Sequence, residues 1–63
     1  MTLTTRQQAK VEMLSRYIDR DNQYALEQIT MGNLDRAQFY LDQVARSAQA
    51  LRDLVDGIAA KQA

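Results

Sequence analysis

The sequence predicts an all-α fold, an antiparallel two-helix hairpin that is expected to dimerise into a four-helix bundle. The 63 residues include no Pro and only two Gly, whereas Ala, Leu, Gln and Arg, which favour helices, are abundant. Apolar residues recur at spacings of three and four, the period of one helix face. Gly32 and Asn33 separate two such stretches near the middle of the chain. We therefore expect one domain over residues 1–63, with a turn at 32–33.

The first helix is expected over residues 5–31, because both of its ends carry capping signals. Thr4 or Thr5 can accept a backbone N–H through its hydroxyl, and Gln7 or Gln8 stands three residues later, which is the spacing of a capping box. Gly32 can adopt the left-handed conformation that closes a helix.

The main apolar stripe of the first helix is irregular. It comprises Val11, Leu14, Ile18, Ala25 and Ile29. Asn22 occupies the place between Ile18 and Ala25, where it either is buried and sets the register of a helix pair or lies partly in water. We favour the solvated position, since polar groups are rarely buried.

The second helix is expected over residues 34–60. Asn33 is suited to cap its N-terminus, and Asp35 lies near the positive end of the helix dipole. Gly57 costs roughly 1 kcal/mol relative to Ala inside a helix. The last residues after Gly57 are therefore expected to fray.

The second helix carries the most regular apolar pattern in the chain. This seam comprises Leu34, Ala37, Leu41, Val44, Ala48, Leu51, Val55 and Ile58. Uninterrupted spacings of three and four are typical of coiled coils and near-parallel bundles. We expect Leu41, Leu51 and Val55 to anchor the core of the hairpin.

Further apolar and aromatic residues lie outside both stripes and form the predicted protein interface. They are Met13, Tyr17, Tyr24, Met31, Phe39 and Tyr40. One hairpin cannot bury so many, and domains of this size usually need a partner chain, a metal or a disulfide. A second copy is the simplest partner because twofold dimers are the commonest oligomers. A different helical protein satisfies the same need.

Composition argues against catalysis and cofactor binding. Cys and His are absent, which removes disulfides, the usual zinc and haem ligands and the commonest general base. The acidic residues, Asp21 among them, are expected on the helix surfaces beside basic neighbours rather than paired in a pocket. We therefore expect no enzyme activity, no cofactor and no metal. Since the sequence contains neither a signal-peptide pattern nor an apolar run of about 20 residues, we expect a cytoplasmic protein that does not bind membranes.

A basic and aromatic stripe on the first helix supports a second hypothesis, RNA binding. Its basic residues are Arg6, Lys10, Arg16 and Arg20, which lie near Tyr17 and Tyr24 around the helix. Such cations can neutralise phosphates while tyrosine rings stack on exposed bases. However, eight basic and eight acidic residues give zero formal charge, so no overall field attracts nucleic acid. We favour solvated cations that pair with neighbouring carboxylates.

The segment around the turn resembles the turn of a tetratricopeptide repeat. Gly32 matches the Gly that begins that turn, Leu34 the bulky residue that opens the next helix, and Ala37 the small residue at the helix contact. The resemblance covers residues 24–51 and implies a helical hairpin. The layout is also similar to the two-helix co-chaperones of type III secretion, which implies a repeat-containing chaperone as partner. The leading hypothesis is a protein-interaction or adaptor module, with an RNA-binding regulator and a secretion co-chaperone as alternatives.

Overall fold

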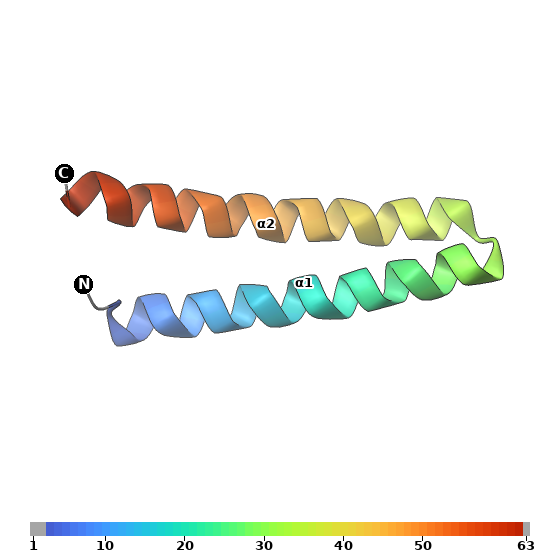
Figure 1. The fold of residues 1–63 in the computed structure, drawn as a ribbon, viewed down its shortest axis with the longest axis horizontal. Helices are drawn as coiled ribbons and strands as arrows, with labels where there is room; N and C mark the ends of the chain where they lie inside the picture. The colour runs from blue at the N-terminus through green and yellow to red at the C-terminus, as the bar shows by residue number, and fades with distance from the viewer. Residues whose placement is uncertain (1–2, 63) are drawn as a thin grey trace.

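The computed structural model describes residues 3–62 and contains two helices, α1 (Thr5–Met31) and α2 (Leu34–Gln62). They run antiparallel and side by side along their whole length (Figure 1). The molecule measures 46 × 18 × 12 Å, so it is a single layer of two helices. This confirms the all-helical class and the packing of two helices against each other. Neither of these helices is long and apolar enough to cross a membrane.

A capping box fixes the start of α1. The Thr4 hydroxyl oxygen accepts a hydrogen bond from the backbone N–H of Gln7 at 3.1 Å. In return, the backbone N–H of Thr4 donates to Oε1 of Gln7 at 2.9 Å. Two backbone donors that would lack partners at a free helix end are satisfied in this way.

The turn between the helices is a Schellman motif built on Gly32. Its φ of 80° is left-handed, a conformation that Gly adopts without the steric cost of a Cβ. The backbone N–H of Gly32 donates to the carbonyl of Ile29 at 3.1 Å, and that of Asn33 to the carbonyl of Gln28 at 2.8 Å. Two of the last four carbonyls of α1, those of Gln28 and Ile29, therefore have partners.

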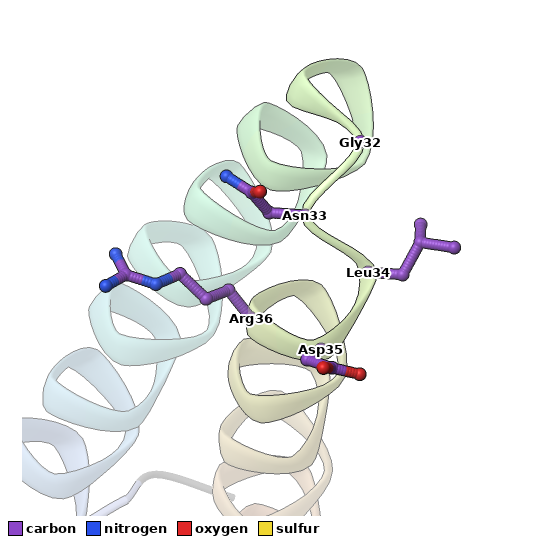
Figure 2. A pocket seen from close by; sticks show the side chains of 5 residues that line it. All are labelled: Gly32, Asn33, Leu34, Asp35 and Arg36. Carbon is purple, nitrogen blue, oxygen red and sulfur yellow. The ribbon is translucent and has the colours of Figure 1, made fainter.

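Asn33 caps α2 with its backbone rather than with its side chain. Its carbonyl accepts from the N–H of Ala37 at 3.0 Å, the first hydrogen bond of α2. Its side-chain amide donates back to Oε1 of Gln28 at 3.1 Å, toward α1 (Figure 2). The side chain expected to cap α2 thus ties the turn to α1 instead.

α2 continues through Gly57 to Gln62, two residues beyond the end expected at residue 60. Leu54 and Ile58, on either side of Gly57, are half-buried on the face that meets α1. Packing of such a face supplies most of the stability of helices in proteins and outweighs the low helix propensity of one Gly.

The hairpin core is small and lies along one row of each helix. Leu14, Ala25 and Ala37 are the buried apolar residues among those described. The inward row of α1 consists of Val11, Leu14, Ile18, Asp21, Ala25 and Gln28, and that of α2 of Ala37, Tyr40, Val44, Ser47, Leu51, Leu54 and Ile58; all are buried or half-buried. Asn22 is exposed, as the favoured interpretation had it.

The predicted seam of α2 is only half covered by α1. Leu51 is half-buried as expected, but Leu41 is 44% and Val55 54% exposed, so their assignment as hairpin anchors was wrong. α1 lies toward the Tyr40 and Leu54 side of the seam, and a single neighbouring helix cannot also cover the other side. The face of α1 that meets α2 also differs from the predicted stripe. Asp21 is buried on it, whereas the predicted stripe residue Ile29 is exposed.

Candidate protein-interaction surfaces

Three aromatic rings pack together on one side of the hairpin, and one of their two contacts joins the helices. The Tyr24 ring of α1 lies 5.3 Å from the Tyr40 ring of α2, centroid to centroid, at an interplanar angle of 50°. The Phe39 ring meets the Tyr40 ring edge-on, at 5.4 Å and 76°. Tilted and edge-on pairs are favoured by the ring quadrupoles, and each contributes about 0.5–1.5 kcal/mol beyond the burial of area. The rings therefore hold one another in place.

These rings border a shallow hollow of about 370 Å³ that opens to solvent. Its lining comprises Arg20, Asp21, Tyr24, Phe39, Tyr40 and Gln43. Phe39 is 58% exposed even though its edge contacts Tyr40. The cluster thus presents ordered aromatic surface to the outside rather than filling a closed core.

Asp21 is a buried carboxylate in the row that faces α2, where it is only 5% exposed. Its Oδ1 accepts from Nε of Arg20 at 3.3 Å, and the Arg20 guanidinium lies 5.1 Å above the Tyr17 ring, a cation–π distance. Sequence reasoning placed Asp21 among the surface acids. The signal that could have identified it is its spacing of three from Ile18 and four from Ala25, both inward residues.

The predicted protein-interface residues lie along the same side of the hairpin, which we name the aromatic flank. It comprises Met13, Tyr17, Tyr24, Met31, Phe39 and Tyr40. Tyr17, Tyr24 and Met31 are spaced by seven and therefore share one line of α1, and Met13 is one turn before Tyr17. All except the half-buried Tyr40 are exposed. The structure brings Tyr24, Phe39 and Tyr40 into contact, whereas Met13 and Met31 extend the flank toward its two ends.

A second apolar surface, the leucine row, runs along α2 and consists of Leu34, Leu41, Ala48 and Val55. Its members are spaced by seven and all are exposed. Leu41 and Gln43 are two residues apart, about 200° around the helix, and Gln43 lines the aromatic hollow. Figure 2 shows the equivalent relation at the turn, where Leu34 and Arg36 point to opposite sides of α2. The leucine row therefore lies on the flank opposite the aromatic one.

The four basic residues considered for RNA binding are all exposed on α1. They are Arg6, Lys10, Arg16 and Arg20. Arg20 already contacts the Asp21 carboxylate and the Tyr17 ring. The side chain best placed beside the aromatic cluster is thus partly neutralised by its own neighbour.

A second hollow, of about 720 Å³, lies open at the turn and is lined by Gly32, Asn33, Leu34, Asp35 and Arg36 (Figure 2). The side chains of Leu34 and Arg36 diverge from it, so its lining does not converge on a ligand. Within residues 3–62, no three His, Cys, Asp or Glu side chains gather where they could hold a metal ion. Comparisons with models of known families, with curated proteins and with solved structures found no match to the chain.

Proposed function

We propose that the chain is a non-enzymatic interaction module, an adaptor that binds other proteins by packing helix against helix. It acts as a homodimeric four-helix bundle, with a helical protein as its partner. The observation that carries this proposal is the balance of apolar surface. Three apolar residues are buried among those described, whereas ten large apolar side chains are at least 40% exposed. Exposed apolar groups that form continuous rows mark sites of association.

The aromatic flank supports a protein partner in particular. Tyr, Phe, Met and Arg are the residue types enriched in interfaces, and all four occur there or beside it. Because Tyr24, Phe39 and Tyr40 already pack on one another, binding needs to order few additional side chains, which lowers its entropic cost. An amphipathic helix with apolar residues at spacings of three, four and seven complements such a flank.

RNA binding and secretion chaperoning are the alternatives to a general adaptor. RNA binding lacks the excess of positive charge that attracts phosphates, since the net charge is zero and Arg20 is paired with Asp21. A secretion co-chaperone is one instance of the proposed mode of action, because it too binds a helical partner protein.

Capture of partners from the native cell lysate tests the proposal when matched variants are compared. Phe39→Ala removes the most exposed ring of the aromatic cluster, and Leu26→Ala removes an exposed Leu outside the aromatic flank, about 200° around α1 from Tyr24. We expect the same protein to be captured by the wild-type chain and by Leu26→Ala, and to be lost with Phe39→Ala. Circular dichroism checks that all three chains remain helical.

Sequencing of nucleic acid in the same eluates separates the RNA alternative. RNA recovered with the wild-type chain and lost when Arg6, Lys10 and Arg16 are changed to Gln would overturn the adaptor proposal. Equal capture of proteins by wild type and Phe39→Ala would remove the aromatic flank as the interface.

A further inference from the structure

We infer that a second copy of the chain covers the leucine row, with a twofold axis crossing α2 near Ala45, and that the dimer presents two aromatic flanks facing away from each other. The dimer contact deepens the proposed function by naming the face and the occupant. Only the role of the two outer flanks as a pair of binding sites rests on that function.

The apolar seam of α2 is covered on one side only. α1 covers one line of the seam, which consists of Ala37, Val44, Leu51 and Ile58. The other line is the exposed leucine row, Leu34, Leu41, Ala48 and Val55. An apolar seam that continues through four heptads without a polar residue is typical of the centre of a bundle. A helix on the leucine-row side completes that centre, and α1 lies on the other side.

The distribution of charge on this flank favours a second copy over a different protein. Tyr24 lies on the aromatic flank, so the residues of α1 on the opposite flank, beside the leucine row, must lie about 200° around α1 from Tyr24. Asn22 and the residues spaced seven from it meet this condition. Two lines of this face consist of uncharged side chains, Gln8, Ser15, Asn22 and Ile29 of α1 and Leu34, Leu41, Ala48 and Val55 of α2. Arg52 lies seven residues after Ala45 on the same side of α2, and its Nε is 3.9 Å from Oδ2 of Asp56 in the same helix. With the axis near Ala45, the Arg52 side chains of two copies are roughly 20 Å apart along α2, so the two copies meet without like charges opposed.

The leucine row is complementary to itself in an antiparallel arrangement. With the axis near Ala45, Leu34 of one copy lies opposite Val55 of the other, and Leu41 lies opposite Ala48. Each large side chain thus meets a smaller one, and Ala45 beside the axis allows the two α2 helices to approach closely. This is the interdigitation that packed helix pairs require.

The hairpin exposes more surface than a compact chain of its mass. The hairpin exposes 5028 Å², whereas a compact monomer of 7.2 kDa exposes about 4,100 Å². The excess of roughly 900 Å² per chain is close to the ~800 Å² that each partner contributes to a standard stable interface. The radius of gyration, 14.5 Å, likewise exceeds the ~10.6 Å of a compact 63-residue domain. One flank buried against a copy removes the excess.

Burial of the leucine row leaves the aromatic flank free in both copies. Because the two surfaces lie on opposite sides of the hairpin, the aromatic flanks of the dimer face outward in opposite directions. A dimer of this kind binds two partner helices, or two sites on one partner, and gains avidity without any new contact.

Sedimentation velocity and site-specific cross-linking of the full chain test the dimer and its face together. We expect twice the 7.2 kDa mass at micromolar concentration, loss of that mass to the monomer in Leu41→Glu, and no loss in Gln23→Glu, an exposed position on the outer side of α1, about 100° around the helix from both Tyr24 and Asn22. The chain has no Cys, so Ala45→Cys and Arg46→Cys each introduce a unique thiol. A short bismaleimide should join two Ala45→Cys chains at least tenfold faster than two Arg46→Cys chains, because Arg46 lies about 140° around the helix from Leu41.

A helical wild-type chain that sediments as a monomer at tens of micromolar would overturn the inference, as would equal cross-linking of the two thiol variants. If Leu41→Glu unfolds as well as losing the dimer mass, the cross-linking rates of Ala45→Cys and Arg46→Cys test the dimer face instead, because these two variants leave the leucine row intact. Failure here is distinguishable from failure of the proposed function. A monomer whose partner capture still depends on Phe39 contradicts only the dimer, and a dimer that captures nothing contradicts only the adaptor.

Discussion

The Tyr24 ring of α1 packs against the Tyr40 ring of α2 with 5.3 Å between centroids, and this pair links the helices on the aromatic flank. Tyr40 also receives the edge of Phe39 and belongs to the inward row of α2, whereas Phe39 is mostly exposed. A substitution of Tyr40 should therefore affect the fold, whereas a substitution of Phe39 should affect mainly the surface.

We expect Tyr40→Ala to lower the free energy of unfolding by about 2 kcal/mol, because it removes a half-buried ring and two aromatic contacts. Phe39→Ala should cost less than about 1 kcal/mol, since its ring is largely hydrated already. Urea unfolding at one fixed chain concentration measures both. Equal losses would contradict the division between fold and surface.

The two glycines should respond with opposite sign to the same substitution. Gly32→Ala places a Cβ on a residue with a φ of 80° and is expected to destabilise by about 1 kcal/mol. Gly57→Ala adds a Cβ to a helical residue with nothing within 4 Å of it, and is expected to stabilise by about 0.5–1 kcal/mol. Thermal unfolding of the two variants is the measurement. A shift in the same direction for both would contradict the Schellman turn or the continuity of α2.

Asp21 is expected to reduce the stability of the hairpin. Burial of a carboxylate that has one 3.3 Å hydrogen bond costs solvation that its exposed partner Arg20 does not fully offset. Asp21→Leu should therefore raise the melting temperature, by an amount equivalent to about 1 kcal/mol, while Arg20 stays in water. Asp21→Asn serves as the matched control of similar shape and should have a smaller effect. Unfolding of Asp21→Leu would show that the carboxylate is needed for helix packing.

The cap of α1 gives a local test at the other end of the hairpin. Thr4→Ala removes the hydroxyl that accepts from Gln7 and should destabilise by about 1 kcal/mol, whereas Thr4→Ser should be nearly neutral. Thr5→Ala, one residue later, is the position control because Thr5 lies inside the helix. Faster amide exchange confined to the first turn of α1 is the expected signature. Equal effects at Thr4 and Thr5 would contradict the capping box.

The ends of the helices could be predicted because their causes are local. The Thr4 hydroxyl, the Gln7 side chain and the left-handed Gly32 act on residues at most four positions away. The rotation of α2 about its axis could not be predicted in the same way. Its apolar residues spread over more than one face, and only contact with α1 selects the Tyr40 and Leu54 side.

The candidate site shows the same division between local and nonlocal causes. The exposure of Phe39 and Tyr24 agrees with their being surplus to one hairpin, although their role as an interface stays a prediction. The contact between Tyr24 and Tyr40 depends on the register of the two helices, and so does the burial of Asp21. A carboxylate is almost never buried without strong pairing, so composition alone assigned Asp21 to the surface.

The antiparallel course of the helices also determines where neighbouring chain segments emerge. The first turn of α1 and the last turn of α2 lie at one end of the molecule, and the turn that joins the two helices lies at the other (Figure 1). The molecule is 46 Å long, so a protein tethered to either end is held nearly that far from the turn. Tyr24 and Tyr40 lie eight residues from Gly32 on either side, in the half of the rod remote from such a tether. A label or carrier domain attached at either end would therefore leave the aromatic cluster open to approach.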